Sequence, residues 1–112
     1  MSYIKEDFIN VEDALRRIGG SMDIYLKLLT KFANGNLLEE LESALASGNT
    51  EEAARFAHTI KGVAANLSLM KLWAISAELE KDIKEGLDTS AQTASLREAH
   101  SITIQIISDM TA

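Results

Sequence analysis

His58 stands in surroundings that are unusual for a surface position. Lys61 follows it by three residues and Gly62 by four, so in a helix both would adjoin the imidazole on one face. A neutral imidazole is a nucleophile near pH 7. If one ring nitrogen took a phosphoryl group, the Lys61 ammonium would partly neutralise the new charge and orient its oxygens.

The rest of the face around the histidine is bare. With about 100° of turn per residue, Ala54, Gly62 and Ala65 lie around it. A solvent-facing helix surface usually carries long charged side chains, and a mid-helix glycine costs roughly 1 kcal/mol relative to alanine. These small residues would let the backbone of another domain approach closely, with Gly62 as the nearest point. The alternative is a solvated histidine beside a solvated lysine and a glycine that serves packing.

The opposite side of the same segment is apolar. Six residues fall within one sector of the helix: Ala53, Phe56, Ala57, Ile60, Ala64 and Leu67. This stripe is sufficient to pack the helix against a core. We therefore predict that His58 is mid-helix and largely exposed.

Apolar residues recur at helical spacing along the whole chain, and no segment of useful length alternates with period two. The sequence predicts helices at about 11–18, 22–33, 37–46, 50–67, 69–85 and 91–110. The second and third are alternatively one kinked helix, because Asn34-Gly35-Asn36 weakens a helix without forbidding it. Asn10, Asn49 and Ser68 are the expected caps at the starts of the first, fourth and fifth helices.

The expected fold is all-α. Short links between long helices favour antiparallel neighbours, which predicts an up-and-down four-helix bundle with one or two additional short N-terminal helices. A length of 112 residues suits a single domain, 1–112, with one modest core. The sequence has no cysteine, which excludes disulfides and thiolate chemistry and fits a cytoplasmic location. There is neither a signal-peptide pattern nor an apolar run of the roughly 20 residues that a membrane span needs.

The composition also limits the possible ligands. A net charge of -6 argues against nucleic acid as the main partner. No cofactor is expected, and two histidines without cysteine make a dedicated metal site improbable. A di-iron bundle would need Glu-x-x-His motifs, but arginine occupies positions 55 and 97. His100, beside the apolar seam of the last helix, is expected to be a partly buried structural histidine.

The segment Ala57-His58-Thr59-Ile60-Lys61-Gly62 resembles the signature of histidine phosphotransfer (HPt) domains, roughly Ala-His-x-Leu/Ile-Lys-Gly. The resemblance includes the upstream segment 10–20, the turn at 45–49, residues 63–67 and Leu79-Glu80. It therefore covers about residues 8–86. One departure is visible, since many family members have glycine where this chain has Ser68.

The resemblance implies a phosphorelay intermediate. In such a relay a histidine accepts a phosphoryl group from the phospho-aspartate of a receiver domain, or from a kinase, and passes it to another receiver. The receiver brings the magnesium, and the HPt domain has no nucleotide site. By this resemblance His58 is the phosphorylation site, Lys61 its electrostatic partner and Gly62 the docking clearance. In the phosphotransfer domain of chemotaxis kinases the glutamate matching Glu80 hydrogen-bonds the imidazole, which would fix its tautomer. The alternative for Glu80 is a solvated helix residue.

The expected partners are a response-regulator receiver domain, a hybrid sensor histidine kinase, or both. The chain is expected to act as a monomeric phosphocarrier and not as an enzyme. A chemically inert helical adaptor or dimerisation bundle is the alternative. The bare face favours the phosphorelay, because an adaptor has no reason to surround an imidazole with alanine and glycine.

Overall fold

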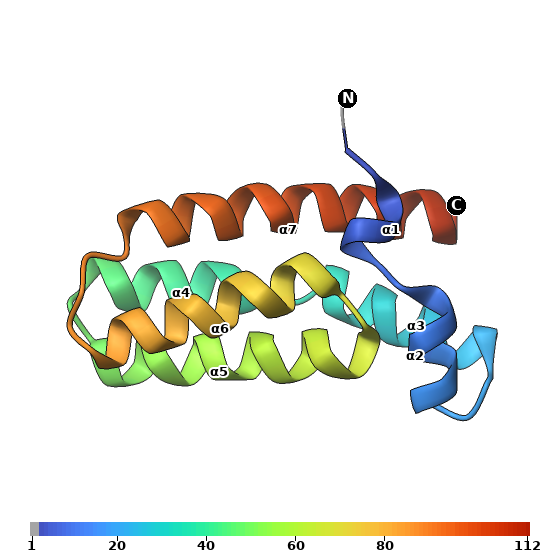
Figure 1. Cartoon of the computed structure of the whole chain (residues 1–112), viewed down its shortest axis with the longest axis horizontal. Helices are drawn as coiled ribbons and strands as arrows, with labels where there is room; N and C mark the ends of the chain where they lie inside the picture. Colours follow the sequence, from blue (N-terminus) through green and yellow to red (C-terminus); the bar gives the residue numbers. More distant parts are fainter. Residues whose placement is uncertain (1–2) are drawn as a thin grey trace.

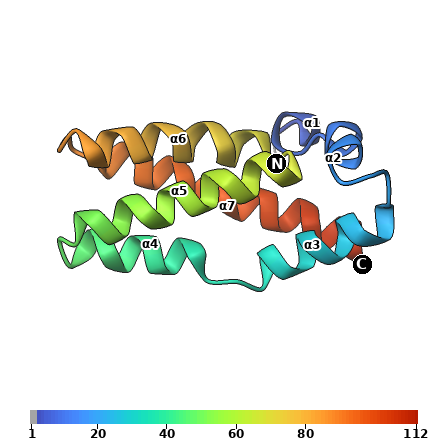
Figure 2. The ribbon, with the colours of Figure 1, turned by 90° about the horizontal axis from the view of Figure 1, so that it is seen from below.

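The computed structural model describes residues 3–112, in which the regular elements are helices. Two short helices come first, α1 (Lys5–Phe8) and α2 (Val11–Arg17). The others are α3 (Met22–Ala33), α4 (Leu37–Ala46), α5 (Thr50–Leu67), α6 (Met70–Lys84) and α7 (Ser90–Thr111). Helices α3 and α4 follow one another along one side of the molecule and together form one arm of the bundle. Helices α5, α6 and α7 form the other three arms (Figures 1 and 2). The predicted all-α four-helix bundle with short N-terminal helices is confirmed.

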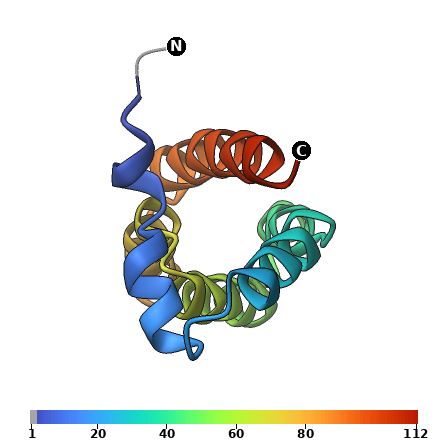
Figure 3. The same ribbon diagram turned by 90° about the vertical axis from the view of Figure 1, so that its right-hand side faces the viewer.

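The core lies along the axis between the four arms. Figure 3 looks along this axis, and Figure 2 shows α1 and α2 beyond the start of α6 at one end of the bundle. The largest fully buried apolar side chains are Tyr25, Leu29, Leu41, Ile60, Leu69, Leu72, Leu79, Leu96 and Ile107. The Tyr25 hydroxyl donates a 2.8 Å hydrogen bond to the Leu67 carbonyl, so its polar end is satisfied inside the bundle. None of the helices in residues 3–112 has the length and hydrophobicity that a bilayer crossing requires.

The second and third predicted helices are separate in the structure. Asn34 ends α3, where its N–H bonds to the carbonyls of Thr30 and Phe32. Gly35 and Asn36 then link it to α4 without helical structure. The low helix propensity of this tripeptide is sufficient to break the arm.

Two of the three predicted caps are found where the sequence placed them. The Asn10 side chain accepts a hydrogen bond from the Asp13 N–H at the start of α2, at 3.0 Å. The Asn49 side chain accepts one from the Glu52 N–H at the start of α5, at 3.1 Å. Each bond satisfies one of the free N–H groups in a first helical turn.

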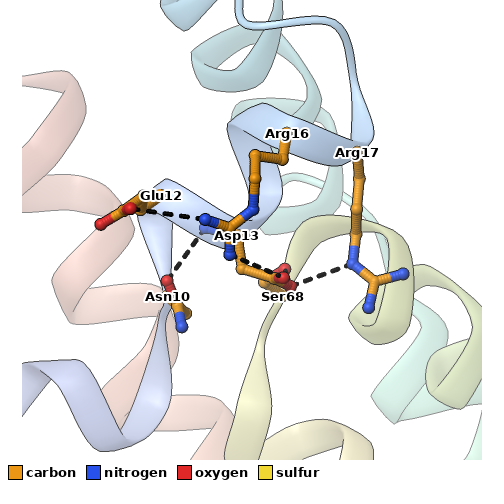
Figure 4. A network of polar contacts seen from close by, with 6 residues as sticks. All are labelled: Asn10, Glu12, Asp13, Arg16, Arg17 and Ser68. Carbon is orange, nitrogen blue, oxygen red and sulfur yellow. Dashed lines mark hydrogen bonds and ion pairs between the residues drawn. The ribbon is translucent and has the colours of Figure 1, made fainter.

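The prediction that Ser68 caps the start of the fifth helix is wrong. Ser68 is instead the C-terminal cap of α5, in the left-handed conformation with φ 54° and ψ 44°, and α6 begins at Met70 without a side-chain cap. This backbone conformation is strained for a residue with a side chain and easy for glycine, which fits the glycine that the resemblance led us to expect at this position. The Ser68 hydroxyl faces α2, where it donates a 2.7 Å hydrogen bond to Asp13 (Figure 4).

This bond belongs to a polar network that joins α2 to the turn between α5 and α6. The Asn10 N–H donates to the Ser68 carbonyl at 3.0 Å, and Arg17 Nε donates to the Asp13 carboxylate, also at 3.0 Å. The Ser68 hydroxyl and the Arg17 guanidinium together lower the pKa of Asp13 to about 2. The ionised carboxylate therefore accepts a charge-assisted hydrogen bond from the left-handed serine.

Candidate functional site: an exposed histidine over a buried glutamate

His58 lies in the middle of α5 with its side chain 67% exposed. The apolar stripe of α5 holds it there, because Ala57 and Ile60 on either side of it are buried in the core. The helix thus turns its core face inward and presents the imidazole to solvent. This is the orientation that a histidine needs in order to react with another molecule.

The three small residues around His58 leave its surface open. Ala54 and Ala65 are half-buried, and Gly62 is exposed. A Cβ atom built on Gly62 would meet no atom within 4 Å apart from the adjacent residues and backbone of its own helix. Packing inside the domain therefore does not require glycine at this position.

Glu80 approaches the imidazole from the neighbouring helix. Helices α5 and α6 form an antiparallel hairpin about the left-handed turn at Ser68, which brings Glu80 of α6 beside His58 of α5. Glu80 Oε2 lies 3.1 Å from His58 Nδ1, and the Glu80 residue is only 5% exposed. The alternative of a solvated helix residue does not hold for Glu80.

Two lysines compensate the charge of the buried carboxylate. Lys61 Nζ lies 2.7 Å from Glu80 Oε1, as an ion pair and not as an aligned hydrogen bond. Lys84 Nζ donates to Oε2 at 2.9 Å. Burial by itself raises the pKa of Glu80, but the two ammonium groups outweigh it and lower this pKa to about 2. Glu80 is therefore an anion at neutral pH.

The charge of Glu80 determines which imidazole nitrogen is free. An ionised carboxylate only accepts hydrogen bonds, so the Nδ1 that faces it carries the proton and donates. In a neutral ring the other nitrogen, Nε2, then holds the lone pair. The arrangement leaves Nε2 as the nucleophilic atom of His58.

Lys84 is a residue that the sequence analysis missed. It follows Glu80 by four residues in α6, and a Glu–Lys pair with this spacing is a common helix-stabilising pair. The spacing of four residues between Glu80 and Lys84 could therefore have indicated this ion pair from the sequence. Lys84 also lines a surface hollow of about 650 Å³ together with Ala54, His58, Glu80 and Ile83.

His100 has a different environment. It is half-buried on α7, and its ring packs edge-on against Phe32 with 5.8 Å between the ring centres. Burial lowers the pKa of His100. No group of three or more acidic, histidine or cysteine side chains within residues 3–112 is arranged to hold a metal ion.

The fold and this site define a class of protein, a helical bundle that presents one histidine backed by a carboxylate. The model of the Hpt domain family matches residues 31–101, more than half of the chain. The chain belongs to this family, whose members carry phosphoryl groups on histidine in two-component phosphorelays. The match runs from the end of α3 into α7 and includes the whole α5–α6 hairpin. Comparisons with curated proteins and with solved structures gave no match.

Proposed function

We propose that His58 is the phosphorylation site of this domain, and that it exchanges a phosphoryl group with the aspartate of a response-regulator receiver domain. The observation that supports this most directly is the pairing of the exposed imidazole with a buried, ionised Glu80. In the neutral ring this pairing puts the proton on Nδ1 and the lone pair on Nε2, on a side chain that is mostly exposed. His100 has no carboxylate within pairing distance in residues 3–112 and is half-buried.

The transfer is a substitution at phosphorus. The Nε2 lone pair attacks the phosphorus of the aspartyl phosphate, a P–N bond forms, and the P–O bond to the aspartate breaks. The aspartate leaves as a carboxylate with the bonding electrons. Because Nδ1 keeps its proton, positive charge develops on the imidazole ring, and the Glu80 anion stabilises it. Transfer onward reverses these steps and returns the electron pair to Nε2.

The residues around His58 take supporting roles in this proposal. Lys61, one turn along α5, pairs with Glu80 before transfer and is close enough in the helix to attract the new phosphoryl oxygens. Ala54, Gly62 and Ala65 form the open surface on which the backbone of the receiver approaches. The donor is either a receiver or a hybrid sensor histidine kinase, since the chain acts as a carrier and relies on a partner for the nucleotide.

The test is incubation with a receiver domain carrying labelled phospho-aspartate, followed by mapping of the label. The proposal predicts one labelled peptide containing His58, with a phosphate that is labile in acid and stable in base. Phosphorus–nitrogen NMR coupling should assign the bond to Nε2. Label on His100, on Nδ1, or on neither histidine would exclude this assignment.

A further inference from the structure

Lys84 and His58 bind the same oxygen of Glu80. Oε2 lies 2.9 Å from Lys84 Nζ and 3.1 Å from His58 Nδ1, while Lys61 pairs with Oε1. The two lysines therefore have different relations to the imidazole. Lys61 occupies the far oxygen, whereas Lys84 competes with the ring for the near one.

This competition has a consequence for the charge of the ring. A lone carboxylate beside an imidazole favours the protonated imidazolium, because opposite charges attract. A protonated ring has no lone pair on Nε2 and is not a nucleophile. The positive charge of Lys84 on the shared oxygen weakens the attraction between Glu80 and the imidazolium.

We propose that Lys84 is a positioning residue of the site, which holds the Glu80 oxygen that faces His58 and opposes protonation of the imidazole. Its placement also brings it to the partner side of the molecule, because Lys84 and His58 line the same open hollow. A docked receiver that excluded water from this hollow would strengthen the interaction. The consequence for transfer rests on the proposed function, while the effect on the charge of the ring does not.

Other charged groups border the hollow, and in the described part of the chain none of them forms an ion pair with the ring. Arg55 is paired with Glu52 at 2.6 Å, and Glu51 lies in the first turn of α5. Among residues 3–112, Glu80 is the charged side chain that pairs with the imidazole, and Lys61 and Lys84 pair with Glu80 in turn. Because the pKa of Glu80 is about 2, Glu80 stays ionised throughout the pH range in which histidine titrates.

The test compares Lys84→Met with Lys84→Arg, which keeps the charge, and with Lys81→Met. Lys81 is exposed on the same helix and makes no ion pair in the part of the chain that the structure describes. Its replacement removes one positive charge without touching Glu80. The first readout is an NMR titration of the His58 ring in the unphosphorylated protein. The midpoint of the His58 ring titration should lie at higher pH in Lys84→Met than in wild type. In Lys84→Arg and Lys81→Met the midpoint should equal that of wild type.

The second readout is the pH profile of phosphorylation by phosphoramidate, in which the donor P–N bond breaks, the new bond to Nε2 forms and ammonia leaves. In Lys84→Met the acid limb of this pH–rate profile should move to higher pH. On that limb the phosphorylation rate should be about two- to fivefold lower than in wild type, which is the size expected for an ion pair with one exposed partner. The alkaline plateau should not fall, because a more basic imidazole is the better nucleophile.

If the Lys84→Met rate is lower by the same factor at every pH and the titration midpoint of the His58 ring does not move, then Lys84 only supports the helix. That result would overturn the inference. A shift that Lys84→Arg does not restore, or that Lys81→Met reproduces, would overturn it as well. If wild type takes up no phosphate while the ring titration still moves in Lys84→Met, the proposed function fails and the charge relation between Lys84 and His58 stands.

Discussion

The two histidines of this chain lie on the same kind of helix in opposite environments. His58 is exposed on α5 above an ionised glutamate, whereas His100 is half-buried on α7 against the Phe32 ring. The first imidazole is open to a partner, and its Nδ1 faces the Glu80 carboxylate. The same partner would meet apolar packing at the second.

This difference shows that the environment of each histidine depends on what a neighbouring helix contributes. Both residues are helical histidines, and their local sequence alone does not give either one a base or a counter-charge. Glu80 from α6 supplies the counter-charge to His58. Phe32 from α3 supplies an apolar wall to His100, and burial lowers the pKa of His100 as a result.

The largest expected difference between the two histidines is in phosphoryl uptake. His58→Gln should reduce labelling by a receiver phosphodonor to background, whereas His100→Gln should leave it intact. The free energy of unfolding of His58→Gln should differ from that of wild type by no more than about 0.5 kcal/mol, because an exposed side chain contributes little packing. Uptake that survives in His58→Gln would refute the assignment.

The open surface beside His58 can be closed with a larger side chain. Gly62→Gln should slow transfer from a receiver by about tenfold or more, because small displacements from an aligned geometry are costly. Its melting temperature should not fall, since a Cβ at this position meets nothing within 4 Å. The matched control, Gly62→Ala, should stabilise the domain by up to about 1 kcal/mol. A destabilised Gly62→Gln, or a stable one with normal transfer, would end the docking interpretation.

Lys61 should have a smaller effect on the same reaction. Lys61→Ala should slow transfer or shorten the lifetime of the phosphohistidine by about two- to fivefold, and Lys61→Arg should preserve most of the rate. The loss of stability should stay within about 1 kcal/mol, because Lys84 still pairs with Glu80. Transfer rates and phosphohistidine decay measured side by side would decide this. Unchanged values would return Lys61 to the role of a structural partner of Glu80.

The smallest expected effect concerns His100 and the pH dependence of stability. Burial lowers the pKa of His100 below its ordinary value of 6.5, so on acidification the unfolded chain takes up a proton before the folded chain does. The free energy of unfolding should therefore fall as the pH drops below about 6.5. Urea unfolding at about pH 7.5 and about pH 5.5 should show a smaller loss in His100→Gln than in wild type. An equal loss of unfolding free energy in both proteins would show that His100 does not cause the pH dependence.

Much of the fold was predictable because it depends on local patterns. The apolar stripe of α5 and the caps at Asn10 and Asn49 involve residues three or four positions apart. The exposure of His58 follows from the same period. Ser68 was assigned to the wrong helix end because its left-handed backbone and its bond to Asp13 depend on where α2 packs, which no local pattern records.

The sequence by itself determined helices α2 to α7 and the face on which His58 lies, because helix periodicity and capping act within one or two turns. Only the tertiary structure decided that Glu80 is buried under the imidazole and shared by Lys61 and Lys84. That arrangement depends on the register in which α6 packs against α5. A shift of α6 by one turn, about 5.4 Å, would keep every helix and separate the carboxylate from His58.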